Sequence, residues 1–149
     1  MRLRHEWIVA ALVAGLVLPA CTRHSQEEVG GDDIASVETI EGTDVARVTL
    51  SADAARRLDI QTAPVREVGG ASGGDPRTAI PYAAVLYDPN GDTWTYTNPE
   101  PLVFVRSAIR VDHINGETAV LSSGPSPGTA VVIVGASELL GTEYRVGEE

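Results

Sequence analysis

Few side chains in this sequence could carry chemistry, and they do not form a complete catalytic or metal-binding set. Asp88, Asn90 and Asp92 have the spacing of the first ligands of a calcium-binding loop. The glutamate that such a loop places later is missing, and Asp-Pro-Asn-Gly is an ordinary turn sequence. We therefore interpret residues 88–92 as a turn and expect no metal site there.

His113 is the only histidine beyond residue 24. It follows Asp112 and comes just before Asn115-Gly116, a strong hairpin signal, so we expect an exposed position. The sequence has no glycine-flanked serine elbow, phosphate-binding loop or histidine pair at metal-ligand spacing. We therefore predict no catalytic residue, no cofactor and no enzymatic activity.

Cys21 is the other residue with distinctive chemistry. Arg2 and Arg4 precede an unbroken apolar run over residues 7–18, which is long enough for a signal-peptide core but short for a bilayer-spanning helix. The run ends at Leu18-Pro19-Ala20-Cys21, which resembles the lipobox of bacterial lipoproteins. This resemblance implies cleavage between Ala20 and Cys21, diacylglycerol on the Cys21 sulfur and a lipid anchor on the extracytoplasmic side of the cell membrane. An ordinary secretory signal that contains a cysteine is the alternative.

The chain is acidic, with a formal net charge of −10 and no lysine. Removal of residues 1–20 would leave nine arginines and twenty acidic residues, a formal charge of −11. Such a surface repels nucleic acids and anionic lipid headgroups, so neither is an expected partner. Because Cys21 is the only cysteine, a disulfide and a cysteine-based metal site are also excluded within this chain.

The composition divides the chain into a leader, a tether and one small domain. Residues 1–20 form the expected signal peptide, and the polar, acidic residues 21–44 are predicted to be a lipidated, disordered tether. Residues 45–147 suffice for one domain. A glycine-rich connector, residues 69–76, interrupts this domain.

The periodicity within that domain predicts a mainly β fold, a single antiparallel barrel or sandwich with one or two short helices. Ser51 is a suitable N-cap for the first helix, and Gly141 is expected to end the second. Pro64 favours a sheet edge. Predicted strands span residues 45–50, 60–68, 79–87, 93–97, 102–114, 117–122 and 129–134, and predicted helices span 52–58 and 137–140.

Strict alternation over residues 93–97 places Trp94 and Tyr96 on one face of a strand. These aromatic side chains could belong to the core or form a docking surface, and we favour the core because the domain has few other large apolar residues. The predicted core comprises Leu50, Leu58, Ile60, Val85, Trp94, Val103, Val105, Ile109, Val111, Ile114, Val120, Leu121, Val132, Val134 and Leu140.

Two stretches resemble the periplasmic adaptor subunits (membrane fusion proteins) of resistance–nodulation–division (RND) efflux pumps. Residues 48–65 (VTLSADAARRLDIQTAPV) resemble the start of these adaptors. Residues 79–146, from IPYAAVLY through INGETAVLS to GTAVV and GASELLGTE, resemble their C-terminal, membrane-proximal domain. This likeness implies a structural coupler that works through a protein–protein interface, without catalytic residues or cofactors.

The chain departs from that family in the middle. Full adaptors carry a lipoyl-like domain, usually a helical hairpin, and a β-barrel between the two stretches, whereas here only residues 69–76 separate them. Direct fusion of the stretches could give a self-contained β-rich domain, but one without the hairpin that reaches an outer-membrane channel.

The leading hypothesis is therefore a lipid-anchored accessory protein of an RND-type efflux system, with the transporter or full-length adaptor subunits as its partners. A stand-alone ligand-binding envelope lipoprotein and a degenerate adaptor remnant remain as alternatives.

Overall fold

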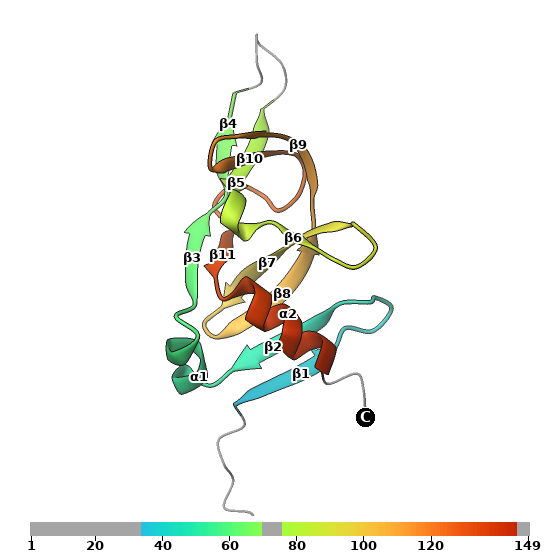
Figure 1. Ribbon diagram of the computed structural model, residues 1–149, viewed down its shortest axis with the longest axis vertical. Helices are drawn as coiled ribbons and strands as arrows, with labels where there is room; N and C mark the ends of the chain where they lie inside the picture. Colours follow the sequence, from blue (N-terminus) through green and yellow to red (C-terminus); the bar gives the residue numbers. More distant parts are fainter. Residues whose placement is uncertain (1–33, 70–75, 146–149) are drawn as a thin grey trace, which may run out of the picture.

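Two antiparallel sheets follow one another along the long axis of the molecule (Figure 1). The computed structural model describes residues 34–69 and 76–145. The larger sheet has the strand order β1-β2-β8-β7-β11-β3, with β6 also paired to β7, and the smaller sheet has the order β4-β5-β10-β9. The mainly β, antiparallel fold class is confirmed, and the two sheets fit a sandwich, whereas the strands of the described residues do not close into a barrel.

The strands are β1 (Ala35–Thr39), β2 (Ala46–Leu50), β3 (Gln61–Pro64), β4 (Arg66–Val68), β5 (Arg77–Pro81), β6 (Leu86–Tyr87), β7 (Thr93–Glu100), β8 (Val103–Ala108), β9 (Arg110–Asn115), β10 (Thr118–Ser123) and β11 (Ala130–Val134). The helices are α1 (Ala52–Arg57), the 3-10 helix η1 (Tyr82–Ala84) and α2 (Ala136–Arg145).

The chain crosses between the sheets at three points where we had predicted continuous strands. The expected strand over residues 60–68 is broken at Val65, and the one over 102–114 is broken at Ile109. The expected strand over 79–87 is interrupted by η1, which ends at the buried Ala84. Val65, Ile109 and Ala84 belong to the same apolar core, so each crossing is stabilised by burial that strand periodicity does not reveal.

Two local predictions at the chain turns are confirmed. Ser51 caps α1, and its side chain accepts a hydrogen bond from the backbone N–H of Ala54. Asn115-Gly116 forms the hairpin between β9 and β10, and the positive φ of 59° at Gly116 is readily adopted by glycine.

The N-terminal boundary of the folded domain was predicted wrongly. Residues 34–44 were assigned to the tether, but Ala35–Thr39 form β1, which pairs with β2 along its whole length. Polar composition hid the strand, because β1 buries little: only Ala35 and Val37 pack against the core. Residues 21–33 of the predicted tether lie outside the described residues.

The C-terminal helix was predicted too short. We expected it to end at Gly141, but α2 continues to Arg145. Leu139 is fully buried and Glu143, one turn later, is also buried, so both contacts hold the second half of the helix on the sheet. This tertiary support outweighs the modest helix-breaking tendency of glycine.

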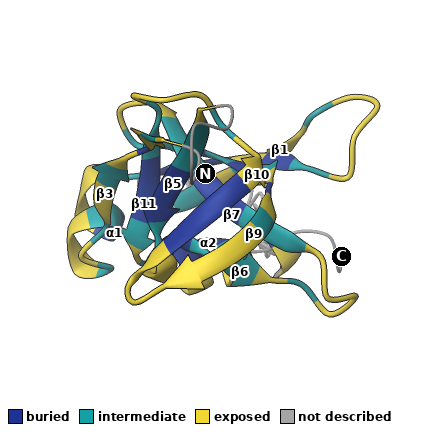
Figure 2. Cartoon of the chain, turned by 90° about the horizontal axis from the view of Figure 1, so that it is seen from above, coloured by how far each residue is buried: buried dark blue, intermediate teal, exposed yellow. Residues whose placement is uncertain are grey.

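The predicted core is partly correct. Leu50, Ile109, Val120, Leu121 and Val132 are buried, as predicted. Ile114 and Val134 are exposed, and their assignment to the core was wrong. Ile114 lies on the edge strand β9, which is exposed along nearly its whole length, whereas β10 and β11 each have buried residues at their centre (Figure 2). Val134 lies at the end of β11.

Candidate functional site

The face of β7 that carries Trp94 and Tyr96 was the candidate docking surface. Tyr96 has no exposed surface and Trp94 is half-buried. The docking alternative is therefore wrong for Tyr96, and the favoured core assignment is confirmed for this residue. The physical reason is that α2 packs over this face of the larger sheet, in contact with β1 and β2.

A buried polar network joins α2 to the sheet at this point. The hydroxyl of Tyr96 donates a hydrogen bond to Glu143 Oε2 of α2. Glu143 Oε1 accepts hydrogen bonds from Arg106 Nε at 3.2 Å and Nη2 at 3.1 Å, and from the backbone N–H of Ala46 at 3.2 Å. The Glu143 carboxylate of α2 thus binds side chains of β7 and β8 and the backbone at the start of β2.

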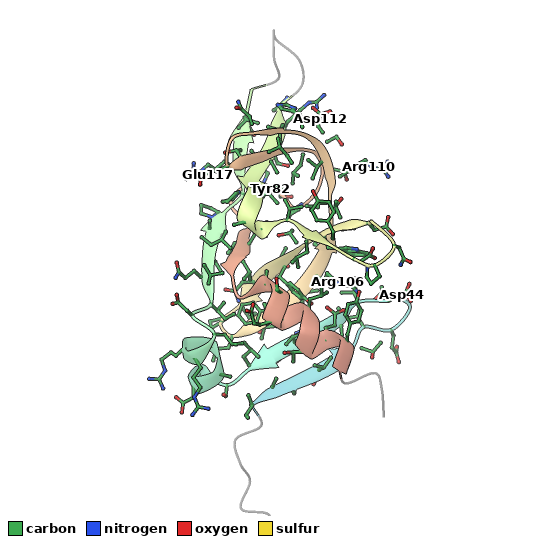
Figure 3. The ribbon with its side chains drawn as sticks, viewed as in Figure 1. Asp44, Tyr82, Arg106, Arg110, Asp112 and Glu117 are labelled. Carbon is green, nitrogen blue, oxygen red and sulfur yellow. The ribbon has the colours of Figure 1, made fainter. Side chains whose placement is uncertain are left out.

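Arg106 enters this network from β8, where it is the cross-strand partner of Tyr96. Its guanidinium also donates to the backbone carbonyl of Asp44 at 2.9 Å, so the loop that leads into β2 is included (Figure 3). The guanidinium carbon lies 4.3 Å from the centre of the Trp94 ring and 5.6 Å from that of Tyr144. Arg106 is therefore compensated by a carboxylate, a carbonyl and two aromatic faces.

Burial, and then the hydrogen bond to Glu143, raise the pKa of Tyr96 far above its ordinary value. Tyr96 therefore remains protonated and keeps its role as donor to Glu143. Because Tyr96, Arg106 and Glu143 are all buried, this arrangement is suited to holding α2 in place and unsuited to exchanging protons with a substrate.

Trp94 connects the network to the turn at residues 88–92. Its indole N–H donates to Asp88 Oδ2 at 3.3 Å, and Asp88 Oδ1 accepts from the backbone N–H groups of Asn90 and Asp92, both at 2.9 Å. Desolvation raises the pKa of Asp88, but these hydrogen bonds outweigh it, and the pKa lies below its ordinary value. The turn interpretation is confirmed.

His113 is exposed on β9, as predicted, with 57% of its side-chain surface accessible. Its Nδ1 lies 2.8 Å from Asp112 Oδ2, and Arg77 Nη1 lies 2.5 Å from the same oxygen. The hydrogen bond with His113, followed by that with Arg77, lowers the pKa of Asp112. Arg77 and Asp112 thus form a surface ion pair, and His113 contacts the same carboxylate.

Within residues 34–69 and 76–145 we find no group of three histidine, cysteine, aspartate or glutamate residues placed to hold a metal ion. No helix in the same part of the chain is long and apolar enough to cross a membrane. The predicted cleavage and lipidation residues, Ala20 and Cys21, lie outside the described residues.

A groove of 630 Å³ lies between β1, β2 and α1, away from the buried network. Asp53 and Arg57 are its charged lining residues, and the rest of its lining is small polar or apolar side chains. This lining lacks a nucleophile–base pair, because serine and threonine have no histidine beside them here.

Sequence reasoning missed Arg106 and Glu143. A signal for Arg106 was present, since it shares a strand face with Phe104, two residues earlier, which is buried. Glu143 follows Leu139 by four residues, and this spacing places both on one helix face. Neither signal identifies the partner, because residues 106 and 143 meet only when α2 packs on the larger sheet.

These features define the chain as a small antiparallel β protein whose C-terminal helix is attached by a buried ionic network. Comparison with models of protein families, with curated proteins and with solved structures finds no match.

Proposed function

We propose that this protein is a non-enzymatic, lipid-anchored accessory protein of an RND-type efflux system, which takes part in export by docking on the transporter or on full-length adaptor subunits. The observation that carries the proposal is the way in which the two adaptor-like stretches combine. Residues 48–65 and 79–146 interleave in the larger sheet instead of forming separate units.

Two strand pairs join the stretches directly, and a third joins the residues that follow the first stretch to the strand at the start of the second. In the larger sheet, β2 pairs with β8 and β3 pairs with β11. In the smaller sheet, β4 pairs with β5, and Val68 is the cross-strand partner of Arg77. The two stretches therefore complete a single fold across the position where full adaptors carry their additional domains.

The pairing of Val68 with Arg77 also explains how the chain can dispense with those domains. Adjacent antiparallel strands need only a short connection, and the residues between Val68 and Arg77 have only to join neighbouring strand ends. The proposed efflux role is thus that of the membrane-proximal part of an adaptor alone.

The proposed anchor keeps this domain close to the membrane. Twelve residues separate Cys21 from Ile34, so a fully extended chain of thirteen residue-to-residue steps would reach about 45 Å. A partner within that reach has to tolerate a strongly acidic surface, so a basic or neutral docking surface on the extracytoplasmic part of a transporter or adaptor fits best.

The test is an affinity purification of the full-length chain, with a C-terminal tag, from mildly crosslinked membranes, followed by mass spectrometry. We expect enrichment of an RND transporter or its adaptor. The matched control is Cys21→Ser, which removes the thiol to which lipid would be attached and should lower both the membrane-bound fraction and the recovery of partners.

Incorporation of labelled palmitate into the wild-type chain, but not into Cys21→Ser, tests the anchor separately. Recovery of the wild-type chain alone would contradict the efflux proposal and favour a stand-alone lipoprotein. Equal labelling of both chains would contradict lipidation at Cys21. The proteins recovered in the affinity purification would still test the efflux role separately.

A further inference from the structure

The strand β1 ends the larger sheet, and among the described residues no other strand pairs with its outer side. It lies at the lower end of the molecule in Figure 1. An uncovered strand edge presents unpaired N–H and C=O groups that can pair with another strand. The edge of β1 is therefore a surface on which a further strand can be added.

The edge strands β3 and β9 carry features that discourage such pairing, and β1 does not. β3 ends at Pro64, and its pairing with β11 is irregular. β9 is bulged against β10 and carries Arg110 and Asp112. β1 pairs with β2 in an unbroken register, contains no proline and has Glu38 as its only charged residue.

The backbone groups on the open side of β1 can be identified from its hydrogen bonds to β2. The carbonyl of Ile34 accepts from the N–H of Ser51, and the N–H of Ile40 donates to the carbonyl of Val45. Bonding direction alternates along an antiparallel strand, so the even-numbered residues point toward β2. The N–H and C=O groups of Ala35, Val37 and Thr39 point outward.

We infer that the outer edge of β1 is a self-association surface, on which β1 of a second copy of this chain pairs in antiparallel orientation with Val37 at the two-fold axis. In this register Val37 faces Val37 of the second copy, and Ala35 faces its Thr39. The N–H and the C=O of each of these outward-pointing residues then both form hydrogen bonds with the opposite strand.

Side chains favour the same register. Ile34, which is 68% exposed, faces Ile40 of the second copy, and the symmetry repeats this apolar pair at the other end. Ser36 faces Glu38, so like charges are not opposed. These contacts cover the most exposed large apolar side chain among the described residues.

The neighbouring symmetric registers are less favourable. Centring the pair on Glu38 places two carboxylates directly opposite each other, which is destabilising. Centring it on Ser36 places Ile34 opposite Glu38. Two-fold symmetry pairs the central residue with itself, so Val37 is the position that satisfies the backbone and side chains together.

Disulfide trapping in membranes from cells that express the full chain tests this inference. Val37→Cys places two thiols on cross-strand partners, within the separation that a disulfide bridges, whereas Ser36→Cys places them two residues out of register. We expect at least about tenfold more disulfide-linked homodimer from Val37→Cys than from Ser36→Cys after mild oxidation. The wild-type chain, whose only cysteine is Cys21, gives the background.

A break in the strand edge provides the second measurement. Thr39 is exposed and its N–H points away from β2, so Thr39→Pro removes a donor only from the proposed interface. Combined with Val37→Cys, it should reduce the dimer to background with an unchanged thermal midpoint. Stronger trapping from Ser36→Cys, equal trapping from both cysteines, trapping that Thr39→Pro leaves intact, or a disulfide to a different protein would each overturn the inference. The inference is independent of the proposed efflux role.

Discussion

The core beneath α2 and the core between the two sheets are made from different kinds of side chain. Beneath α2, apolar residues such as Val48 and Leu139 surround the polar network of Tyr96, Arg106 and Glu143. Between the sheets, the core is formed by aliphatic residues, including Ile80 and Leu121. One core therefore depends on specific hydrogen-bonding partners and the other on apolar burial.

The difference matches what each core has to hold. The core between the sheets contains the crossing points Val65 and Ile109, where the chain itself connects the two layers. The helix α2, by contrast, is attached to the sheet through a single connection after β11. The shared carboxylate of Glu143 provides α2 with a position along the sheet that non-directional apolar contacts would define less sharply.

The largest effect is expected at Glu143. Glu143→Ala should lower the free energy of unfolding by about 3–5 kcal/mol, because it leaves the Arg106 guanidinium buried without its carboxylate. Urea denaturation of the purified chain measures this. Glu143→Gln separates charge from hydrogen bonding, because the amide keeps an acceptor oxygen but lacks the charge. It should lower the free energy of unfolding by less than Glu143→Ala does.

Glu138→Ala is the matched control, because Glu138 is exposed on the same helix. It should change stability by less than about 1 kcal/mol. A loss of similar size in both variants would mean that α2 contributes through helix formation alone, and the contrast between the two cores would fail.

Leu121→Ala probes the aliphatic core and should cost about 3 kcal/mol, through lost apolar burial and the cavity that remains. Ser122→Ala, at the exposed neighbouring position on β10, controls for the strand itself. The double variant of Leu121→Ala and Glu143→Ala should be additive within about 0.5 kcal/mol, because the residues belong to separate clusters. Strong non-additivity in urea denaturation would mean that the cores act as one.

The sequence was sufficient for the features that depend on local pattern. The turn at Gly91, the cap at Ser51 and the hairpin at Asn115-Gly116 involve residues close together in the chain, and all were predicted correctly. Alternation also placed Trp94 and Tyr96 on one face of a strand. In each case the physical cause lies within a few residues of its effect.

The features that were missed depend on distant contacts. The breaks at Val65 and Ile109 come from burial in a core shared by segments far apart in sequence. The extension of α2 beyond Gly141 depends on Glu143 meeting Arg106 of β8. β1 was hidden because a polar strand at a sheet edge is stabilised by its backbone pairing with β2, which composition does not report.

The smallest effect, and one of opposite sign, is expected on the face of β7 that turns away from Tyr96. Thr93, Thr95 and Thr97 share this face. The hydroxyls of Thr93 and Thr97 donate to the carbonyls of Ile109 and Val105, whereas Thr95 Oγ1 is buried and has no hydrogen-bond partner among the described residues.

A buried hydroxyl in this situation is destabilising, so Thr95→Val should raise the free energy of unfolding by about 1 kcal/mol. Thr97→Val, which loses a hydrogen bond at an equivalent position, should lower it by a similar amount. Thermal or urea unfolding of the two variants side by side measures the difference, and a loss of stability in both would mean that the Thr95 hydroxyl is as well bonded as its neighbours. Opposite signs would show that a buried polar group on β7 stabilises the fold when it is hydrogen-bonded and destabilises it when it is not. The polar core beneath α2 is then stable because its groups are paired.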